Sequence, residues 1–475
     1  MCGIAGIVTK QSVRQKIYQN SISKMVACLY HRGPDSQGIY SFEHCALGNT
    51  RLSFVDLKNG QQPILSNDKQ SAITFNGEMY GFQSIRNKVK AYPFKTNTDT
   101  EIVLALYEKY KNDFITHVAG MFGLAIWDNT AQKLILARDR FGEKPLYYAH
   151  GKNGEFLFAS EIKALLSTGL VEPILNEKAI SHYVKRAYVW PQQSIYKNIY
   201  VLPPAHILIF ENNTVSTKKY WRLPMNNASK LSLKQAAEQF QFLFEQAVKK
   251  QLIADVPVGA FLSGGLDSST VVAIASKWQQ NLKTFSFGFK KGVDSELPFA
   301  KQIAEKYDTQ HFELQDDNIN IADLIWKMQT VYDEPFGDSS NIPTYLICKL
   351  ARKHTKVVLT GDGADELLGG YLFWGRYLFP EIQKQAKQKT QPTWQKWAMA
   401  MLWAMSRWKN KLFNPKKNTT ITAANPNLAN DYIQKYYYFR CHFSPQEIAN
   451  LGLPKDDEDI NSVSYTHLRA HETSE

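Results

Sequence analysis

The hydrophobic positions up to Ala205 fall in short consecutive groups separated by glycine, proline and asparagine turns. Two groups span Gly120 to Asp128 and Lys133 to Arg138, and their unbroken apolar character predicts strands buried on both faces. Residues 140–145 separate two strand-like stretches, which predicts a hairpin loop. One helix is predicted from Thr100 to Tyr110, where apolar residues recur three and four positions apart. A layered α+β domain is therefore expected.

A different pattern begins near Leu233. A helical stretch from Leu233 to Gln251 precedes a predicted strand at Val256 to Leu262, a helix at Ser268 to Trp278 and a strand at Thr284 to Phe289. Strand, helix and strand at this spacing form a βαβ unit, which implies an α/β domain with a parallel sheet. In such a sheet, binding groups are expected at the carboxyl ends of the strands.

A chain of 475 residues exceeds what one hydrophobic core usually supports, so two domains are expected. We assign residues 2–205 to the first domain, 206–230 to a polar, turn-rich linker and 231–463 to the second domain. Residues 464–475 follow no pattern that we recognise and are interpreted as a non-native tail.

Composition narrows the class of protein. A hydrophobic content of 44% and a charged content of 21% are typical of a soluble globular protein. No segment approaches the roughly 18 uninterrupted apolar residues of a membrane-spanning helix, and the amino terminus has neither a basic leader nor a cleavage site. A cytoplasmic location is expected, and contact with a membrane is not.

Charge and cysteine content exclude two further classes. Much of the net charge of +12 lies between Glu381 and Lys417, and no aromatic RNA-binding signature accompanies it, so no nucleic-acid partner is expected. The five cysteines include no Cys-x-x-Cys pair, which argues against a disulfide framework and a zinc site.

Cys2 occupies a special chemical position. Removal of the initiator methionine before a small residue would leave Cys2 with a free α-amino group, so one residue would carry both a nucleophile and a base. The amine has a reference pKa of about 7.7 to 8.0 and the thiol about 8.5, so the amine can accept the thiol proton near neutral pH. By itself such a cysteine is more often a small buried residue, and the assignment depends on its companions.

Five short motifs occur in order within the first domain: Cys2 to Gly6, His31 to Asp35, Arg51 to Ser53, Asn76 to Tyr80 and Asp99 to Glu101. Taken singly, each is compatible with a structural role, since Asn-Gly, for example, is a common turn dipeptide. As an ordered set they resemble the glutaminase domain of the N-terminal-nucleophile amidotransferases, over the whole first domain. The resemblance implies an αββα layered sandwich of the N-terminal nucleophile type.

The same resemblance implies a role for each residue. Arg51 would hold the α-carboxylate of glutamine, because its planar cationic fork matches a carboxylate, and Glu78 and Asp99 would hold the α-ammonium group. A side-chain amide and a backbone N–H would stabilise the tetrahedral oxyanion, each by on the order of 3 kcal/mol. The loop of His31 is interpreted as shaping the pocket rather than transferring protons. The catalytic and glutamine-binding candidates are Cys2, Arg51, Asn76, Gly77, Glu78 and Asp99.

A second chemical motif lies between a predicted strand and a predicted helix, where residues 261–269 are Phe-Leu-Ser-Gly-Gly-Leu-Asp-Ser-Ser. Two glycines let backbone N–H groups approach an anion, hydroxyl groups add donors, and the helix N-terminus adds a favourable dipole. The mononucleotide P-loop pattern is absent. The string resembles the SGG-x-DSS loop of ATP pyrophosphatases, which cleave ATP to AMP and pyrophosphate.

A glycine loop with three carboxylates follows a further predicted strand, at residues 360–366. A solvated acidic turn is one interpretation, but acids beside a phosphate loop favour a cation. Asp267 and Asp365 are the Mg²⁺ candidates, since Mg²⁺ prefers one or two carboxylates with phosphate oxygens and water.

Together the two strings resemble the synthetase domain of asparagine synthetases. The resemblance implies that backbone at Leu262, Phe287 and Gly361 contacts the adenylate and that Asp362 acts near the activated intermediate. Residues 333–340 resemble a family loop near the aspartate pocket, with a proline-bearing connection between helices as the alternative. The ATP-binding candidates are Leu262, Ser263, Gly264, Gly265, Asp267, Ser268, Phe287, Thr360 and Gly361.

A glutaminase joined to an adenylating domain implies that aspartate is amidated to asparagine. Aspartate and ATP would give β-aspartyl-AMP and pyrophosphate, and ammonia from glutamine would displace AMP, with Mg²⁺ as cofactor. Two alternatives stay open: an amidotransferase for another carboxylate, such as an antibiotic or cell-envelope precursor, and a chain that retains only glutaminase activity. A homodimer also stays open.

Two features depart from the family pattern. The sequence lacks a Lys-x-Asp-x-x-Ser/Thr-Met-Ala-like string, so an incomplete synthetase domain is expected. The basic, tryptophan-rich segment 383–417 predicts an amphipathic helix. We favour packing of this helix on the synthetase domain, with attachment to an anionic membrane as the alternative.

Overall fold

The computed structural model describes residues 1–224, 229–288, 295–315, 320–371, 441–443 and 445–454. They fall into two compact units, which differ from the two predicted domains. The first unit holds residues 1–362 and the described residues of 443–456, and thus the first domain and the second domain up to Asp362. The second unit begins at Gly363. The predicted helix in segment 383–417 and the predicted tail at 464–475 lie outside the described residues.

The first domain contains two antiparallel sheets of six strands. The first sheet has the order β10 (Ile199–Val201), β8 (Tyr147–His150), β9 (Phe156–Ala159), β1 (Gly3–Val8), β3 (Cys45–Arg51) and β2 (Ser36–Ser41). The second has the order β12 (Thr214–Lys219), β11 (His206–Glu211), β7 (Lys133–Arg138), β6 (Gly120–Asp128), β5 (Ser71–Met79) and β4 (Ile64–Leu65).

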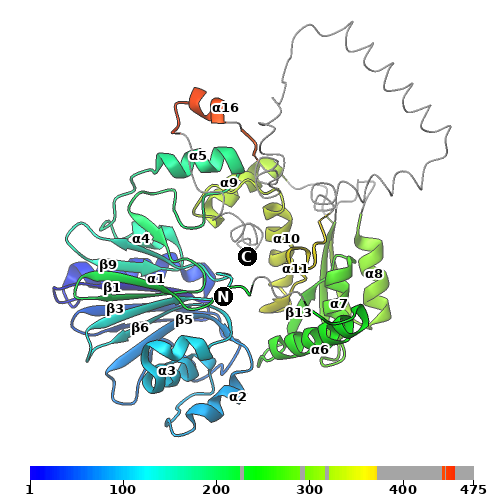
Figure 1. Ribbon diagram of the computed structural model, residues 1–475, viewed down its shortest axis with the longest axis horizontal. Helices are drawn as coiled ribbons and strands as arrows, with labels where there is room; N and C mark the ends of the chain where they lie inside the picture. The colour runs from blue at the N-terminus through cyan, green and yellow to red at the C-terminus, as the bar shows by residue number, and fades with distance from the viewer. Residues whose placement is uncertain (225–228, 289–294, 316–319, 372–440, 444, 455–475) are drawn as a thin grey trace, which may run out of the picture. The chain divides into compact units, whose positions relative to one another are not determined.

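Helices cover the outer faces of the two sheets. Figure 1 shows α1 (Lys16–Cys28) and α4 (Ile162–Leu166) over the first sheet and α3 (Asp99–Tyr110) over the second. The arrangement is the expected αββα sandwich. The remaining helices of this domain are α2 (Phe82–Arg86), α5 (Glu177–Arg186) and the 3₁₀ helices η1 (Tyr30–Arg32), η2 (Asn87–Val89) and η3 (Lys111–His117).

Strand β6 explains why the apolar positions are consecutive. Phe122, Leu124 and Ile126 pack in the core beneath α3, whereas Ala125 and Trp127 pack in the core between the two sheets. Successive side chains of a strand point to opposite faces, so a strand with a core on each side is apolar at every position. The prediction of strands buried on both faces is confirmed for β6.

The linker prediction is wrong for residues 206–219. They form β11 and β12, and β11 pairs with β7 in the second sheet. Strand β12 lies at the edge of this sheet and is mostly exposed, so its polar residues give no hydrophobic signal for a strand.

The hairpin prediction for residues 140–145 is also wrong. Strand β7 belongs to the second sheet and β8 to the first, so the loop crosses from one sheet to the other. The Asp139 carboxylate organises the loop by accepting hydrogen bonds from the backbone N–H groups of residues 141–144. Local turn residues cannot distinguish this crossing from a hairpin.

The second domain contains a parallel sheet, as predicted. Its order is β15 (Gln310–Gln315), β14 (Lys283–Gly288), β13 (Val258–Phe261) and β16 (Val357–Leu359). Because β13 and β16 are parallel neighbours, the loops that follow them lie at the same edge. The helices are α6 (Leu233–Gln251), α7 (Leu266–Ala275), α8 (Leu297–Lys306), α9 (Ile321–Val331) and α10 (Asn341–Ala351).

Two short helices remain. Helix α11 (Ala364–Leu368) belongs to the second unit, and α16 (Pro445–Asn450) to the first. Residues that follow α16 contact α5, where the Ser181 hydroxyl donates to the carbonyl oxygen of Pro454 at 2.6 Å. Throughout the described ranges, no helix has both the length and the apolar character that crossing a membrane requires.

Candidate functional site

Cys2 lies immediately before β1 and is buried. Strand β1 pairs with β3 so that Gly3 is opposite Thr50, which places Cys2 beside Arg51 at the end of β3. Burial raises the pKa of the Cys2 thiol above 9.0, although the ammonium of Met1, the backbone N–H of Leu52 and Arg51 all lower it. The thiol therefore needs a nearby base to ionise, and Arg51 and an N–H donor are in place to stabilise the thiolate.

Arg51 is also buried, with its guanidinium held by the loop that follows β3. Its Nη2 donates to the carbonyl oxygens of Val55 at 2.8 Å and Asp56 at 2.9 Å. Among the described residues these are its hydrogen bonds, so Nη1 and Nε remain able to donate to a carboxylate. Gly60 packs against the same group, since an added Cβ would lie 2.2 Å from Nη2.

Asn76 lies on β5, on the face that points toward the first sheet. Thr74, two residues earlier and thus on the same face, donates from its hydroxyl to the carbonyl oxygen of Gly48 in β3. The Asn76 side chain is 0% exposed, and neither Nδ2 nor Oδ1 has a hydrogen-bond partner within the described part of the chain. A buried polar group without a protein partner requires an explanation, such as a ligand, a catalytic role or a bound water.

Gly77 and Glu78 follow on the same strand. A side chain at Gly77 would not fit, because an added Cβ would lie 2.1 Å from the carbonyl oxygen of Met121 in β6. Glu78 is half-buried. Gly77 thus brings the backbone of β5 close to β6, immediately beside the buried amide of Asn76.

Asp99, the first residue of α3, joins this region through β5. Its Oδ2 accepts a hydrogen bond from the N–H of Met79 at 2.8 Å, one residue after Glu78. Burial raises the pKa of Asp99 from 3.8 to about 6, although hydrogen bonds from Met79 and Thr100 lower it. The six predicted glutaminase residues thus lie at the ends of β1 and β3, on β5 and at the start of α3.

Sequence reasoning missed the roles of Arg32, which holds Cys2, and of Glu161, which holds Arg32. The Arg32 Nε donates to the carbonyl oxygen of Cys2 at 3.0 Å, and its Nη1 lies 2.8 Å from Oε1 of Glu161. His31 contacts the same oxygen through Nε2 at 2.9 Å. Burial opposes ionisation of Glu161, but His31 and Arg32 outweigh it and lower its pKa to about 2. Arg32 belongs to a motif already singled out, whereas Glu161 carries no local signal.

The loop at residues 333–340 connects α9 and α10, and its first two acids contact the first domain. Asp333 lies 3.2 Å from Nζ of Lys163, which also pairs with Glu161 at 2.9 Å. Glu334 accepts a hydrogen bond from the N–H of Ile195 at 2.7 Å. Burial raises the pKa of Glu334 from 4.5 to about 7, with a further increase from Asp333.

The serine and glycine loop follows β13. Gly264 has φ of +84°, and a Cβ there would lie 2.6 Å from the backbone nitrogen of Ala300, so glycine is required. The Ser268 hydroxyl accepts from the N–H of Ser263 at 3.2 Å and lies 3.0 Å from the Ser263 hydroxyl. Gly265 precedes α7, whose first turn contains Asp267. The loop is thus shaped by its own hydroxyl groups at a helix N-terminus.

The loop after β16 touches the loop after β13. A Cβ at Gly361 would lie 2.8 Å from the nitrogen of Ser268 and 3.1 Å from the carbonyl carbon of Asp267. Thr360 precedes this contact, and the exposed Asp362 follows it at the end of the first unit. The structure therefore brings together the two strings that the sequence singled out.

Three further candidates for ATP or metal binding are described by the structure, and their roles stay predictions. The N–H of Leu262 donates to the carbonyl oxygen of Phe285, and its own carbonyl accepts from the Ser286 hydroxyl, so only a second lone pair is left for a nucleotide. Phe287 lies near the carboxyl end of β14 and is half-buried. Asp365 is in α11, in the second unit. Within the described ranges, no cluster of three or more His, Cys, Asp or Glu could hold a metal ion.

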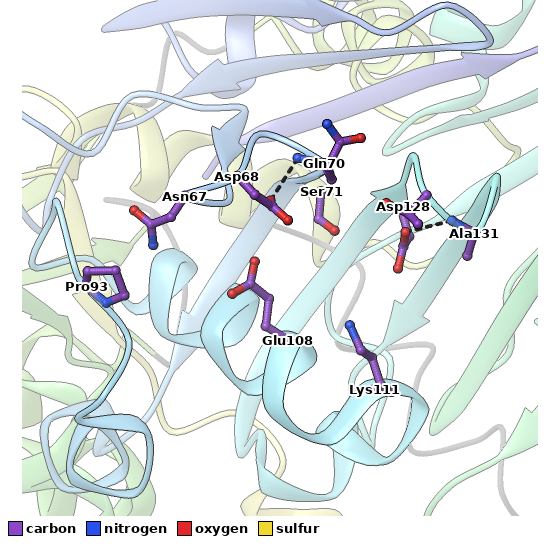
Figure 2. Close-up of a pocket in the computed structure, with 10 residues that line it drawn as sticks. Asn67, Asp68, Gln70, Ser71, Pro93, Glu108, Lys111, Asp128 and Ala131 are labelled. Carbon is purple, nitrogen blue, oxygen red and sulfur yellow. Dashed lines mark hydrogen bonds between the residues drawn. The ribbon is translucent and has the colours of Figure 1, made fainter.

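A separate hollow of about 530 Å³ contains none of the candidate residues. Figure 2 shows Asp68, Glu108 and Asp128 at its lining. Asp68 and Asp128 accept hydrogen bonds from the backbone of Gln70 and Ala131, respectively, which are turn contacts. The acids are thus partly engaged in local structure, and no role follows for them.

The first domain has two antiparallel sheets with a buried cysteine beside the first strand, and the second domain has a parallel sheet with a serine and glycine loop. This combination is typical of a glutamine amidotransferase domain linked to an ATP-using synthetase domain. The Glutamine amidotransferase domain family matches residues 1–221, and the Asparagine synthase family matches residues 239–470. A relative from Methanocaldococcus jannaschii, named as a glutamine-hydrolysing asparagine synthetase, is 37% identical over 397 residues, with 78% of this chain and 76% of the relative covered. The chain belongs to the family of glutamine-hydrolysing asparagine synthetases.

Other relatives are longer. Asparagine synthetase 1 of Bacillus subtilis is 35% identical, with 78% of this chain and 59% of the relative covered. Asparagine synthetase 2 of Arabidopsis thaliana is 33% identical, with 79% of this chain and 61% of the relative covered. The chain thus spans about three fifths of the length of these two relatives. Among solved structures, a phosphoribosylpyrophosphate amidotransferase from B. subtilis matches with 14% identity and a TM-score of 0.35, covering 76% of this chain and 82% of that chain.

Proposed function

We propose that the protein hydrolyses glutamine at Cys2 and uses the ammonia, together with ATP, to convert aspartate to asparagine. The first half begins when the α-amino group that methionine removal leaves on Cys2 takes the thiol proton. The thiolate attacks the γ-carboxamide carbon of glutamine, ammonia leaves, and water hydrolyses the resulting thioester to glutamate and the free thiol. The pKa of the thiol, raised by burial, makes the adjacent base necessary.

The buried amide of Asn76 carries the glutaminase proposal. Its Nδ2 is a donor without a partner in the described residues, on a strand that packs against β1 and β3. A tetrahedral intermediate places an oxyanion beside the nucleophile, and a preorganised donor there stabilises the transition state more than the substrate. Without such a ligand, burying this amide only destabilises the fold.

Charges around the thiol fit the two ends of glutamine. Arg51 has Nη1 and Nε available for the α-carboxylate. Glu78 and Asp99 lie at the far end of β5 and would hold the α-ammonium. An ionised Asp99 is needed for that contact, so its pKa of about 6 sets a lower pH limit for binding.

The second half is proposed at the loops that follow β13 and β16. The β-carboxylate of aspartate would attack the α-phosphorus of ATP and release pyrophosphate, and ammonia would then displace AMP to give asparagine. Ser263, Gly264, Gly265 and Ser268 would receive phosphate oxygens, since the loop precedes a ten-residue helix. Asp267 fits a Mg²⁺ ion that takes its other ligands from phosphates and water, and Mg²⁺ would neutralise phosphate charge.

The nucleotide product tests this half. With ATP, aspartate and ammonia, the protein is expected to release AMP and pyrophosphate in equal amounts. ADP and phosphate as the main products would contradict the proposal. Comparing aspartate with glutamate and other carboxylates then identifies the acceptor, because AMP formation should depend on the acceptor.

A further inference from the structure

The guanidinium of Arg51 is oriented by a loop rather than by neighbouring strands. Its Nη2 donates to the carbonyl oxygens of Val55 and Asp56, within 2.9 Å of each. These two hydrogen bonds fix which edge of the guanidinium faces the loop, and thus which edge is left for glutamine. The position of the loop therefore determines the geometry of the predicted carboxylate contact.

A residue of the second domain holds this loop from both sides. Asp255, three positions before β13, donates its N–H to the carbonyl oxygen of Phe54 at 2.7 Å. Its carboxylate Oδ2 accepts the N–H of Asp56, also at 2.7 Å. One side chain and its own backbone thus clamp the stretch that supplies the carbonyl groups to Arg51.

Lys356 adds a second attachment. Its Nζ lies 2.6 Å from Oδ2 of Asp35 and 3.4 Å from the carbonyl oxygen of Ser53. The same Asp35 oxygen accepts the N–H of Ser53 at 2.8 Å. Burial opposes ionisation of Asp35, but Lys356 and Ser53 outweigh it and lower its pKa, so the contact is charged at neutral pH. The start of the Arg51 loop is therefore also held from the second domain.

Both holders lie at the amino-terminal edge of the parallel sheet. Asp255 precedes β13 and Lys356 precedes β16, whose carboxyl ends carry the serine and glycine loop and the Gly361 loop. At about 3.3 Å per residue, Lys356 and Gly361 are separated by about 16 Å of mostly extended chain. A packed sheet is a rigid support, which suits residues that position a binding group.

We infer that Asp255 and Lys356 are positioning residues for glutamine: the synthetase domain holds the loop that orients Arg51. The inference rests on the proposed role of Arg51 in binding the glutamine α-carboxylate. It makes the affinity of the glutaminase for glutamine depend on side chains that belong to the other domain. Neither residue needs to touch glutamine or Cys2.

The test compares glutamine with its α-amide, which lacks the carboxylate. Asp255→Ala removes the acceptor for Asp56, and Lys356→Met removes the ammonium but keeps the length of the side chain. Asp255→Asn keeps an acceptor oxygen and the backbone N–H, so it is the conservative control for Asp255→Ala. Lys277→Met is the matched control for Lys356→Met, because Lys277 pairs with Glu245 inside the second domain at 2.8 Å. Steady-state glutamate or glutamate α-amide release gives KM and kcat for each protein.

We expect Asp255→Ala to raise the KM for glutamine about tenfold, with kcat changed less than about twofold, as expected when a binding contact weakens. Lys356→Met should raise KM about threefold, and Asp255→Asn and Lys277→Met should stay near the wild-type values. For the α-amide, all five proteins should give similar KM values. Thermal unfolding identifies any variant that fails to fold; if Asp255→Ala does not fold, the KM of Lys356→Met decides.

Equal losses on both substrates would overturn the inference in favour of a general structural role, and so would an unchanged KM for glutamine in both Asp255→Ala and Lys356→Met. Failure of the proposed function is distinct. In that case the wild-type protein itself would release no glutamate, or would not prefer glutamine to its α-amide.

Discussion

Replacing Asn76 by alanine separates a catalytic amide from a structural one. The side chain is fully buried on β5, and neither of its polar atoms has a hydrogen-bond partner in the described residues. A structural asparagine in such a place would form hydrogen bonds. Asn49 on β3 does so through its Nδ2, which donates to Gln62 at 3.3 Å and to Thr74 at 3.1 Å, whereas its Oδ1 has no partner in the described residues. Asn49→Ala is therefore the matched control.

Asn76→Ala should leave the free energy of unfolding unchanged or slightly higher, but it should strongly lower the rate of glutamine hydrolysis. An unpartnered buried amide destabilises the fold by about 1 to 3 kcal/mol, and Asn76→Ala removes that effect. The cavity left by the amide costs on the order of 1 kcal/mol, so the free energy of unfolding should be unchanged or slightly higher. Loss of an oxyanion donor should lower kcat for glutamine hydrolysis by about 100- to 1000-fold. Asn49→Ala breaks two hydrogen bonds and should lower stability by about 1 to 3 kcal/mol.

Two measurements on each variant are sufficient: glutamate release at saturating glutamine, and thermal or denaturant unfolding. We predict a slow but stable Asn76→Ala protein. This prediction is refuted if Asn76→Ala unfolds more easily than wild type while its residual folded fraction hydrolyses glutamine at the normal rate. That result would make Asn76 an ordinary core residue.

Two further predictions concern pH. Asp99 has a pKa of about 6, so as the pH falls through 6 it loses the charge proposed to hold the glutamine ammonium. The KM for glutamine should therefore rise below pH 6. Asp99→Asn lacks this charge and should show a high KM at every pH. Glu334 has its pKa raised from 4.5 to about 7, so its contribution to stability is present below pH 4.5, declines between 4.5 and 7 and is lost above 7. Glu334→Gln keeps the acceptor for Ile195 but cannot ionise. Its free energy of unfolding should therefore match that of wild type at pH 4 and exceed it by up to about 3 kcal/mol above pH 7. An equal gap at both pH values would contradict the burial argument.

Sequence alone predicts best where one local rule decides the structure. The strands Gly120–Asp128 and Lys133–Arg138 have the predicted bounds, because burial on both faces makes the interior positions apolar and charged residues stand at the strand ends. Helix Leu233–Gln251 also has the predicted bounds, and its N-terminus is fixed by the capping box of Ser232 and Gln235. Helix α7 begins two residues earlier than predicted, since Gly265 caps it without a side chain.

Contacts between distant segments could not be predicted in this way. Glu161 is 129 residues from Arg32, and no local pattern marks it as the partner that orients the arginine. The same holds for Asp255, whose carboxylate reaches the backbone of Asp56 across 199 positions. In the first domain the motifs predict which residues form the glutaminase site, but only the fold shows what holds Cys2 and Arg51 in place.

The central claim is that the first domain releases ammonia from glutamine at Cys2 and the second domain uses it to make asparagine. Replacing Cys2 by alanine tests this claim most directly. The measurement is asparagine formation with ATP and aspartate, supplied in parallel with glutamine or with ammonia. We predict that the Cys2→Ala protein forms no asparagine from glutamine and retains the wild-type rate with ammonia. Continued glutamine-dependent synthesis at the wild-type rate would contradict the assignment of Cys2 as the nucleophile.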